Sequence, residues 1–390
     1  MTAGSQPPSI CLDVSAAVHR RAGLGRYAES LARSLIAAHP DRYTLFYNRE
    51  RGIEPLAGLA HVPARSVALG YKPWRMLVWG GQLARLGFDR LVSGELFHAT
   101  EHLLLPLRGI PTVLTVHDLI FGHLPAHHKR LNRWYLNLAM PLYCRRATHI
   151  IAVSEHTRRD LIAAYGLAAS KITVVHEAAA SHFRPPSPEA VSAVRSRYGL
   201  PERYLLCVGT IEPRKNLSRL LSAFEAVRDE GLTDGLVIVG RRGWLYGSFL
   251  AQLEGSPAKE AVFFPGYVPD EDLPAFYGGA QALAFPSLYE GFGLPVLEAM
   301  ACGTPVVASE RSSIPEIGGD AVSTFDPTDE EAIARALCQV LRDPDLQREM
   351  RARGLVQAAR FSWARAAAET EAVYDRVLGE RARRSSLGVA

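Results

Sequence analysis

The sequence predicts an α/β protein of two Rossmann-like domains that face each other across a cleft. Short apolar runs alternate with longer segments of helical periodicity along the whole chain. Most of these runs are apolar without interruption, which is typical of parallel strands covered by helices on both faces. A proline-rich stretch, Phe183-Arg-Pro-Pro-Ser-Pro188, separates two complete sets of such elements. Together these features predict one parallel sheet in each half.

Each half contains six expected strands, and helical patterns connect them. The strands of the first half are Ile10–Val14, Tyr43–Tyr47, Leu96–Ala99, Thr112–Val116, His149–Val153 and Ile172–Val175. Those of the second half are Tyr204–Val208, Leu236–Val239, Val262–Phe264, Ala282–Phe285, Pro305–Ala308 and Val322–Phe325. The clearest helical patterns are Arg26–Ala38, Leu217–Arg228 and Glu330–Leu341. We expect an N-terminal domain over residues 1–183 and a second domain over 184–363. Residues 364–390 are expected to form a last helix from about Ala364 to Leu378 and a frayed tail over Arg381–Ala390.

Composition indicates a cytoplasmic globular protein. Hydrophobic residues make up 48% and charged residues 22% of the 390 residues, and the net charge of +4 is too small to imply a nucleic-acid partner. No apolar run reaches the roughly 18 residues of a membrane span, and Met1–Pro8 do not resemble a signal peptide. Five cysteines without a CxxC pair argue against a zinc site or a disulfide framework.

The segment Glu290-Gly-Phe-Gly-Leu-Pro-Val-Leu-Glu298 follows the expected strand Ala282–Phe285. In parallel sheets, ligands bind beyond the carboxyl ends of the strands. Gly291 and Gly293 allow a ligand to approach the backbone closely, and Pro295 suits the start of a helix. We expect Glu298 in the first turn of that helix, near its free N–H groups and positive dipole end. For Glu298 alone, an acid that merely complements the helix dipole is the competing interpretation.

Arg214 and Lys215 follow another expected strand, in Gly209-Thr-Ile-Glu-Pro-Arg-Lys-Asn216. Arg can hold phosphate oxygens with two parallel hydrogen bonds, and Lys adds a compact charge. Only five residues of the chain are Lys, which gives Lys215 weight as part of a diphosphate site. A solvated basic pair is the competing interpretation.

The first half offers a histidine and a glycine segment. His117-Asp118 follows the strand Thr112–Val116, where a His can bind a substrate hydroxyl or transfer a proton, or be held by Asp118 for structure. Gly23-Leu-Gly-Arg-Tyr-Ala28 matches a dinucleotide fingerprint but lies about eight residues beyond its strand, too far for the tight turn of that fingerprint. We interpret it as a mobile glycine loop over a phosphate or sugar, and NAD binding is the alternative.

Some motifs are absent, and others have a structural explanation. The sequence contains no phosphate-binding P-loop motif and no HExxH pattern. Asp270-Glu-Asp272 and Asp343-Pro-Asp345 could hold Mg²⁺ but precede helical patterns and are interpreted as helix N-caps. His127-His128 is interpreted as a surface pair. We therefore expect no required metal and no other cofactor.

These motifs resemble the GT-B glycosyltransferases of family 4, the retaining group called glycosyl transferases group 1. The resemblance covers nearly the whole chain. In the second half it rests on Gly209–Asn216, Gly266–Asp270, Glu290–Glu298 and Ala299–Val307. In the first half it rests on Gly23-Leu-Gly-Arg-Tyr27, His117-Asp118 and Val153-Ser-Glu-His156.

The resemblance implies a role for each matching residue, with a nucleotide sugar as donor. Glu298 would bind the ribose, and Glu290 with the backbone of Gly291, Phe292, Gly293 and Leu294 would hold the donor sugar. Arg214, Lys215, Gly25 and the turn at Gly209 would meet the diphosphate. Val268 and Asp270 would contact the base, and His117 would face the sugar at the reacting centre. The last helix would cross back onto the N-terminal domain.

The resemblance also implies a reaction, transfer with retained configuration by front-face attack and without a metal. Arg21-Ala-Gly-Leu-Gly-Arg-Tyr27 and Thr115-Val-His-Asp-Leu-Ile-Phe121 resemble bacterial mannosyltransferases of polysaccharide assembly, which favours GDP-mannose over UDP-glucose. The acceptor would be a glycan or lipid-linked glycan on the N-terminal domain, with no nucleic acid involved. Tyr71-Lys-Pro-Trp-Arg-Met-Leu-Val-Trp79 is either a contact with the inner face of the membrane or a packed amphipathic helix. A nucleotide-sugar epimerase, a glycan phosphorylase and a non-catalytic nucleotide-sugar-binding subunit are the alternatives.

Overall fold

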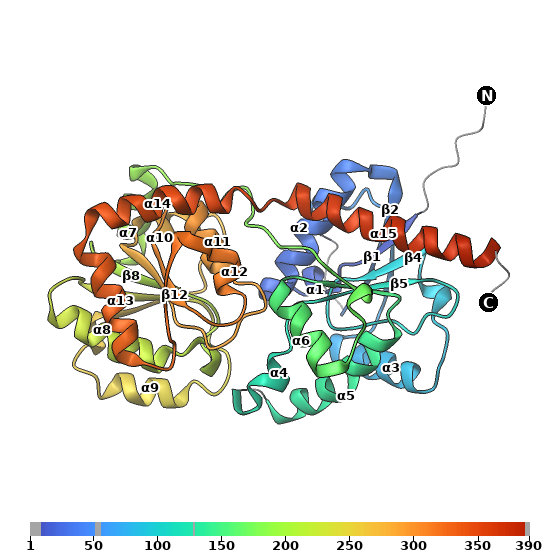
Figure 1. Cartoon of the computed structure of the whole chain (residues 1–390), viewed down its shortest axis with the longest axis horizontal. Coiled ribbons are helices and arrows are strands. Elements are labelled where there is room, and N and C mark those ends of the chain that lie inside the picture. The colour runs from blue at the N-terminus through green and yellow to red at the C-terminus, as the bar shows by residue number, and fades with distance from the viewer. Residues whose placement is uncertain (1–8, 51–55, 128, 387–390) are drawn as a thin grey trace. The chain divides into compact units, whose positions relative to one another are not determined.

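A computed structural model describes residues 9–50, 56–127 and 129–386 as two compact units. Unit 1 comprises the chain up to Leu119, residues Trp134–Glu177, and the chain from Trp363 onward. Unit 2 comprises Ile120–Arg133 and Ala178–Ser362. Figure 1 shows an α/β arrangement in each unit, as predicted. The segment Ile120–Arg133, which the sequence placed in the first domain, groups with unit 2.

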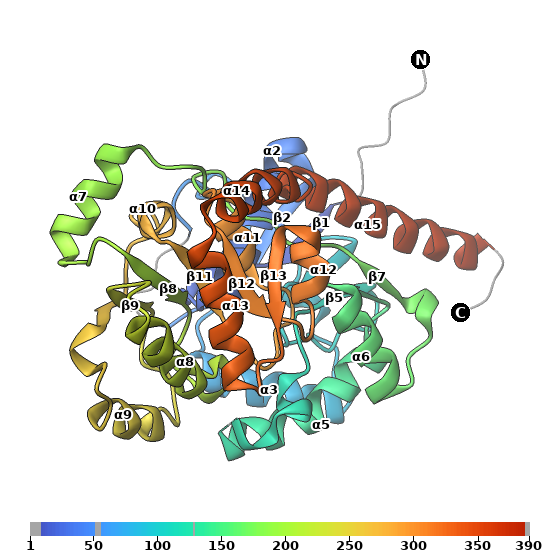
Figure 2. The same ribbon diagram turned by 60° about the vertical axis from the view of Figure 1, so that its left-hand side comes forward.

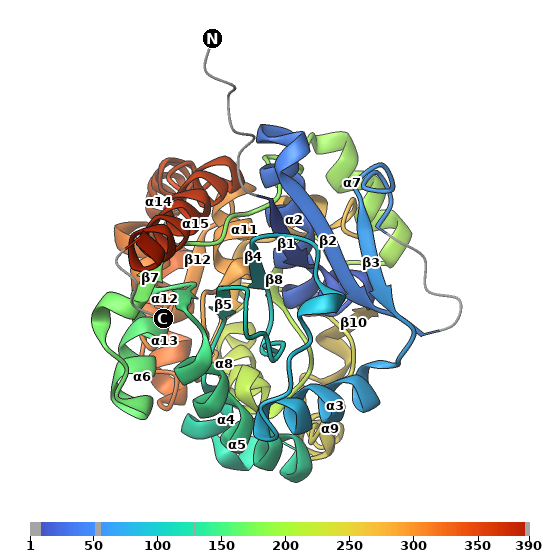
Figure 3. The ribbon, with the colours of Figure 1, turned by 90° about the vertical axis from the view of Figure 1, so that its right-hand side faces the viewer.

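Unit 1 contains a seven-stranded parallel sheet in the order β3-β2-β1-β4-β5-β6-β7 (Figure 3). The strands are β1 (Ile10–Asp13), β2 (Tyr43–Asn48), β3 (Ala64–Val67), β4 (Leu96–Ala99), β5 (Thr112–Val116), β6 (His149–Ala152) and β7 (Ile172–Val174). All residues of β1, β4, β5 and β6 are buried, as strands covered on both faces require. The chain order reverses between β1 and β4, which is where such sheets bind ligands at their carboxyl ends.

The helices of unit 1 flank this sheet. They are α1 (Ser15–Val18), α2 (Ala22–Ala38), α3 (Tyr71–Leu83), α5 (Arg130–Arg146) from Trp134 onward, α6 (Glu155–Tyr165) and α15 (Trp363–Ser386). Helix α15 continues to Ser386, past its predicted end near Leu378, so the prediction of a frayed tail was wrong for residues 381–386. Tyr374 of α15 is fully buried and its hydroxyl lies 2.6 Å from Nδ1 of His98 on β4, so the last helix is anchored in unit 1.

Unit 2 contains a six-stranded parallel sheet in the order β10-β9-β8-β11-β12-β13 (Figure 2). The strands are β8 (Tyr204–Val208), β9 (Gly235–Val239), β10 (Val262–Gly266), β11 (Ala282–Phe285), β12 (Val306–Ser309) and β13 (Val322–Phe325). Its helices are α4 (Ile120–His123), α7 (Pro188–Tyr198), α8 (Leu217–Asp229), α9 (Gly247–Glu254), α10 (Leu273–Gly279), α11 (Leu294–Ala301), α12 (Ile314–Gly318), α13 (Glu330–Arg342) and α14 (Pro344–Ala358). Helices α8, α9 and α13 bury one hydrophobic core against the strands.

The predicted strands are all present, and the sequence missed one, β3. Its residues Ala-Arg-Ser-Val are exposed or half-buried, because β3 lies at the edge of the sheet and pairs only with β2. It therefore has none of the continuous apolar character that identified the others. All five cysteines are free and buried, in agreement with their spacing. No helix within residues 9–50, 56–127 and 129–386 has the length and apolar composition of a membrane span.

Candidate functional site

The loop between β8 and α8 positions Arg214 and Lys215 at the carboxyl end of the sheet in unit 2. Gly209 has φ +148°, a conformation that residues with a side chain rarely adopt, and a Cβ there would lie 2.8 Å from Cε of Lys215, so glycine suits both the turn and the path of this lysine. The short 3₁₀ helix Pro213–Lys215 then ends at Asn216, which has φ +58°. The Asn216 amide donates to the carbonyls of Pro286 and Pro327 at 3.2 and 2.7 Å, which fixes the loop to the end of β11.

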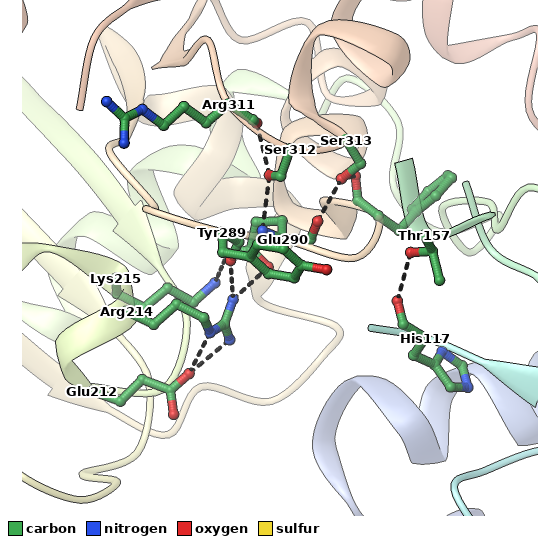
Figure 4. A network of polar contacts seen from close by, with 11 residues as sticks. His117, Thr157, Glu212, Arg214, Lys215, Tyr289, Glu290, Arg311, Ser312 and Ser313 are labelled. Atoms are coloured by element: carbon green, nitrogen blue, oxygen red, sulfur yellow. Dashed lines mark hydrogen bonds and ion pairs between the residues drawn. The ribbon is translucent and has the colours of Figure 1, made fainter. Parts of the chain in front are cut away.

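Glu290 lies between these two cations (Figure 4). Lys215 Nζ is 2.7 Å from Glu290 Oε1, and Arg214 Nη1 is 2.6 Å from Glu290 Oε2. Arg214 also donates to the carbonyl of Tyr289 at 3.0 Å. The sequence predicted these three residues at the ends of two strands, and β8 and β11 are neighbours in the sheet. The structure therefore joins two motifs, 75 residues apart, into one ionic network.

The cations control the charge of Glu290. Burial by itself would raise the pKa of this carboxyl group. Arg214 and Lys215 outweigh burial, and together with the hydrogen bond from Lys215 they lower its pKa to about 2. Glu290 is therefore ionised at neutral pH. An ionised carboxylate between two cations can be replaced by another anion, such as a diphosphate, without leaving the cations unpaired.

Glu212 is a member of this network that sequence reasoning missed. Arg214 Nε donates to Glu212 Oε1 at 2.9 Å, so the guanidinium is held between Glu212 and Glu290 (Figure 4). The other carboxylate oxygen of Glu212 is buried without a hydrogen-bond partner. Its position two residues before Arg214 was the available signal, but most acids in loops are simply solvated, so this spacing alone does not identify a partner. A cavity of about 450 Å³ adjoins the network, and Glu212, Pro213, Asn216 and Leu288 are among its lining residues.

Serine hydroxyl groups shape the backbone from Glu290 to Leu294. Ser313 Oγ donates to the carbonyls of Glu290 and Phe292 at 3.1 and 2.7 Å, and the Glu290 N–H donates to Ser312 Oγ at 2.9 Å. Gly293 follows with φ +107° at the N-cap of α11. The glycine-rich turn at the start of a helix is therefore present as predicted.

Glu298 lies elsewhere than predicted. We expected it in the first turn of the helix, but it is the fifth residue of α11, which begins at Leu294. The dipole at the helix start therefore does not explain Glu298, because that effect is confined to the first turn. Its carboxylate is 2% exposed and accepts a hydrogen bond of 2.7 Å from the Tyr277 hydroxyl of α10. Tyr277, 21 residues earlier in the chain, had no signal in the sequence.

The two DxD segments differ in structure. Asp343 caps α14 as predicted, since its carboxylate accepts hydrogen bonds from the N–H groups of Asp345 and Leu346 at 3.0 and 2.9 Å. Asp272 stands at the N-cap of α10 but makes no such hydrogen bond, so the capping prediction was wrong for this side chain. Its carboxylate binds Arg197 and Tyr198 instead, at 2.9 and 2.7 Å.

Other predicted residues of unit 2 lie near the end of β10 or outside the described part. Val268, two residues after β10, is buried, and Asp270 follows it. His123 stacks on Tyr289, next to Glu290, with 5.1 Å between ring centroids. The carbonyl of His127 accepts a hydrogen bond of 2.8 Å from Trp244 Nε1. His128, the other half of the expected surface pair, lies outside the described residues.

The described residues contain no group of three or more His, Cys, Asp or Glu side chains arranged to hold a metal.

His117 of unit 1 is buried and both of its ring nitrogens have partners. Nδ1 lies 3.0 Å from Glu177 Oε1, and Nε2 lies 2.9 Å from the carbonyl of Thr100. Burial alone would lower the pKa of His117, but Glu177 and the Thr100 carbonyl outweigh it and raise this pKa above its ordinary value. Two acceptors facing the two nitrogens fit a doubly protonated, positively charged ring. Figure 4 shows the carbonyl of His117 accepting from the Thr157 hydroxyl, at 3.2 Å.

Gly25 lies in a helix, and the prediction of a mobile glycine loop was wrong. Helix α2 begins at Ala22, so the glycines at 23 and 25 form its first turns. A Cβ at Gly25 would lie 2.9 Å from the carbonyl oxygen of Ala16. The missing side chain therefore allows α2 to pack closely on α1. A glycine motif looks the same whether the glycine is needed for helix packing or for close approach of a ligand.

A second polar cluster in unit 1 escaped the sequence reasoning. Asp13 ends β1 and Glu101 follows β4, and each has a buried oxygen without a hydrogen-bond partner. Arg21 forms an ion pair with Glu101, and its guanidinium also donates to the Tyr71 hydroxyl at 2.6 Å. Burial, followed by the neighbouring charge of Glu101, raises the pKa of Asp13 to about 7. The cluster lies at the carboxyl ends of the strands, where ligands bind in such sheets.

Comparison with known families agrees with these observations. Residues 194–356 match the family described as Glycosyl transferases group 1, and residues 21–180 match Glycosyltransferase Family 4. The chain is 37% identical over 272 residues to the O-antigen chain mannosyltransferase B of Escherichia coli. This alignment covers 69% of this chain and 71% of that protein. It is 31% identical over 286 residues to the serotype-specific mannosyltransferase WbdA of Escherichia coli, covering 67% of this chain and 33% of that protein. The chain thus spans about a third of WbdA.

Solved structures show the same fold. Sucrose-phosphate synthase from Thermosynechococcus elongatus superposes with a TM-score of 0.77 at 20% identity, over 95% of this chain and 99% of that chain. WaaG, a glycosyltransferase involved in lipopolysaccharide biosynthesis, gives a TM-score of 0.69 at 15% identity, over 93% and 98% of the two chains. With two Rossmann-like units and the matches to both halves, the chain belongs to the GT-B glycosyltransferases of family 4.

Proposed function

We propose that the protein transfers a hexose from a nucleotide diphosphate sugar to a hydroxyl group of a glycan or lipid-linked glycan, with retained configuration and without a metal. The observation that carries this proposal is the network in which Arg214 and Lys215 hold Glu290 at the carboxyl ends of β8 and β11. It combines two cations suited to a diphosphate with a carboxylate suited to sugar hydroxyls.

The donor diphosphate would replace part of the Glu290 contacts. Arg214 stays oriented by Glu212 when Glu290 moves toward the sugar, because the guanidinium binds both carboxylates. In the reaction, negative charge builds up on the leaving diphosphate, and Arg214 and Lys215 would stabilise it. The peptide N–H groups at the start of α11 would add to this stabilisation.

The remaining donor contacts follow the motif residues. The backbone of Gly291, Phe292, Gly293 and Leu294 would bind the sugar, and Glu298, oriented by Tyr277, would accept hydrogen bonds from the ribose hydroxyls. Val268 and Asp270 would contact the base, and Gly209 and Gly25 would face the diphosphate.

His117 would reach the sugar by exchanging its hydrogen bond to the Thr100 carbonyl for one to a sugar hydroxyl. Glu177 would keep the ring charged and in place during that exchange.

Retention is proposed to occur by front-face attack, with the leaving phosphate accepting the proton of the acceptor hydroxyl. Both oxygens of Glu290 are bound to cations, which lowers the nucleophilicity of this carboxylate. Glu290 therefore serves better as a sugar-binding group than as a nucleophile. Trapping of a covalent glycosyl adduct on Glu290 would contradict front-face attack.

GDP-mannose is the favoured donor. The names of two relatives support it, O-antigen chain mannosyltransferase B of Escherichia coli and a GDP-mannose-dependent phosphatidylinositol monomannoside mannosyltransferase of Mycolicibacterium smegmatis, 33% identical over 202 residues. UDP-glucose is the second candidate, because HepE of Anabaena, solved with UDP-glucose, has the same fold with a TM-score of 0.73.

The acceptor is proposed to bind unit 1 at the cluster of Arg21, Tyr71 and Glu101, where polar groups surround the carboxyl ends of β1 and β4. A lipid-linked acceptor would bring the protein to the inner face of the membrane. Helix α3 carries Met76 and Leu77, 53% and 45% exposed, and Trp79 of α3 contacts Trp134 of α5 with 5.9 Å between ring centroids. Trp74, by contrast, is buried, so α3 both packs on unit 1 and leaves apolar side chains for a peripheral contact.

Thermal stabilisation by GDP-mannose, UDP-glucose, dTDP-sugars and NAD, followed by transfer assays with mannose oligosaccharides in EDTA, tests the proposal. We expect stabilisation by GDP-mannose and transfer of mannose with the α configuration of the donor. Stabilisation by NAD but by no sugar nucleotide would contradict it. Sugar-nucleotide turnover that needs no acceptor and yields an isomeric sugar would instead indicate an epimerase.

A further inference from the structure

A chain of buried polar side chains crosses unit 1 from the last helix, α15, toward His117. The Tyr374 hydroxyl of α15 lies 2.6 Å from Nδ1 of His98 on β4, and Nε2 of His98 lies 2.7 Å from the Thr115 hydroxyl on β5. The Tyr27 hydroxyl of α2 lies 3.0 Å from the same Thr115 oxygen. All four side chains are fully buried, so bulk water does not compete for these hydrogen bonds.

The chain ends at the ring of His117. The rings of Tyr27 and His117 meet edge to face, with 4.6 Å between their centroids and an angle of 88° between their planes. This arrangement is favourable for two aromatic rings, and an aromatic ring also attracts a cation to its face. Tyr27 therefore forms one wall around a ring that Glu177 and the Thr100 carbonyl hold in its charged form.

His98 is the neutral link in this chain. Burial, followed by the charge of His117, lowers the pKa of His98 to about 3. A neutral imidazole has one N–H donor and one acceptor nitrogen, so its two contacts have opposite directions. When Nδ1 accepts from the Tyr374 hydroxyl, Nε2 must donate to the Thr115 hydroxyl. The His98 ring therefore couples the orientation of the hydroxyl on α15 to that of the hydroxyl on β5.

Helix α15 also reaches Tyr27 by a second route. The ring of Trp363, the first residue of α15, lies edge to face with the Tyr27 ring, with 5.8 Å between centroids. The two helices α15 and α2 pack on each other. Tyr27 is thus held at its ring by Trp363 and at its hydroxyl by Thr115. A tyrosine side chain has two rotatable torsions, so these two contacts are enough to fix its orientation.

Other titratable groups face His117 as well. The charges of Glu177 and Asp118 raise its pKa, and the ring of His102 lies edge to face with it, with 5.8 Å between centroids. None of these residues belongs to α15. The route from the last helix to His117 therefore passes through the Tyr27 ring.

We propose that Tyr374 of the last helix is a positioning residue for His117, on which it acts through the Tyr27 ring. Tyr374 itself is remote from donor and acceptor. By fixing Tyr27, it keeps the His117 ring oriented while Nε2 exchanges the Thr100 carbonyl for a sugar hydroxyl. This consequence for the reaction rests on the proposed function, whereas the effect on the His117 ring does not.

The test is Tyr374→Phe in the full chain, which removes the hydroxyl and keeps the ring of a fully buried side chain. Loss of one hydrogen bond of about 1 kcal/mol corresponds to a factor of about five, so we expect kcat for transfer from GDP-mannose to fall about fivefold. The KM of the donor should not change. NMR of protein with isotope-labelled histidine follows the titration of His117. Its midpoint should move to lower pH, because a loosely held Tyr27 ring stabilises the charged imidazole less.

Tyr43→Phe is the matched control. Tyr43 is also a buried tyrosine whose hydroxyl binds α15, at Glu371, about one turn before Tyr374, but it lies outside the chain to His117. We expect both variants to lose thermal stability and only Tyr374→Phe to change kcat and the His117 titration. Equal effects of the two variants on His117 would reduce the role of Tyr374 to anchoring the helix and would overturn the proposal. An unchanged His117 titration in Tyr374→Phe would overturn it too.

Variants of Tyr27 provide an independent test should Tyr374→Phe fail to fold. Tyr27→Phe keeps the ring beside His117 and loses the contact with Thr115, so it should shift the titration as Tyr374→Phe does. Tyr27→Leu also removes the ring and should shift the titration further. Equal titrations of Tyr27→Phe and the wild type would rule out the hydrogen-bonded chain. If the wild type turns over no sugar nucleotide, the proposed function fails, and the titrations still decide the role of Tyr374.

Discussion

Glu290 of unit 2 and Asp13 of unit 1 are both buried carboxylates at the carboxyl ends of parallel strands, yet their pKa values are shifted in opposite directions. Glu290 lies between Arg214 and Lys215, and its pKa falls to about 2. Asp13 lies beside Glu101, whose ion pair with Arg21 leaves Asp13 without a cation of its own, and burial raises its pKa to about 7. Topology brings an acid to a site, and the neighbouring charges then decide whether that acid carries a proton.

The difference has consequences for the two sides of the proposed reaction. The network in unit 2 is ionised at neutral pH and can exchange one anion for another. In the cluster of unit 1, burial and the charge of Glu101 keep the Asp13 carboxyl group partly protonated near neutral pH. Variants of the two sites can break or sharpen this contrast, beginning with the largest expected effect.

Glu290→Gln removes the charge that balances Arg214 and Lys215 and weakens the contacts to the sugar. We expect kcat to fall by about 100- to 1000-fold, the usual effect of losing a group that acts in the transition state. The affinity for the nucleoside diphosphate should stay nearly unchanged, because the cations remain. Steady-state kinetics and calorimetry measure the two quantities. Glu310→Gln, at an exposed position of unit 2, is the control and should change neither quantity. A loss of nucleotide affinity in Glu290→Gln as large as its loss of kcat would contradict the assignment.

Lys215→Ala leaves Glu290 with one cation and removes a contact to the diphosphate. Removing one partner of a buried charge pair between a protein and its ligand costs about 3 kcal/mol of binding, so the Kd of the intact donor should rise about 100-fold. Lys259→Ala provides a matched control, because Lys259 pairs with Glu254 on the surface of the same unit at 2.8 Å. An exposed pair of that kind contributes little. Unchanged donor affinity in Lys215→Ala would exclude this lysine from the diphosphate site.

The raised pKa of Asp13 predicts a loss of stability with rising pH. The folded state favours the protonated carboxyl group, so this contribution is fully present below its ordinary pKa of 3.8 and is lost as the pH rises through about 7. The loss is on the order of 4 kcal/mol over that window, since each pKa unit corresponds to about 1.4 kcal/mol. Asp13→Asn should flatten the pH dependence of the unfolding free energy between pH 4 and 8, and the exposed Asp41→Asn should not. A similar slope in both variants would assign the titration to other groups.

Glu290 predicts the opposite pH dependence. Its lowered pKa gives stability that is present above the ordinary value of 4.5 and lost as the pH falls toward about 2. In Glu290→Gln this acid-side loss should shrink, whereas Asp13→Asn should leave it in place. Chemical unfolding of the two variants at pH 3 and pH 6 therefore tests whether the contrast between the carboxylates is real.

Tyr277→Phe should have the smallest effect. It removes one hydrogen bond to Glu298 and leaves the packing of α10 intact. A single hydrogen bond contributes about 1 kcal/mol, so we expect a rise of about fivefold in the KM of the donor and an unchanged kcat. Tyr198→Phe removes a comparable hydroxyl that binds Asp272, away from Glu298, and should change neither constant. Equal kinetics of the two variants would remove Tyr277 from the ribose site.

Sequence patterns were sufficient wherever a physical requirement acts on neighbouring residues. Most of the twelve predicted strands are buried on both faces, which demands continuous apolar runs, whereas β10 and β13 are apolar although only partly buried. Arg214 with Lys215, and Glu290 with its glycines, could be identified because each motif is contiguous and follows a strand. The exposed edge strand β3 and the helical start of α2 could not, since an exposed strand needs no apolar run and a glycine can serve helix packing or a ligand equally well.

The sequence by itself determined two parallel α/β units and the chemical groups available at the ends of their strands. Only the tertiary structure decided which groups meet and in which charge state. Glu177 is 60 residues from His117, and Glu290 is 75 residues from Lys215. The reason is physical, because pKa values and hydrogen bonds depend on distances in space and on burial, and the fold sets both for residues that are far apart along the chain.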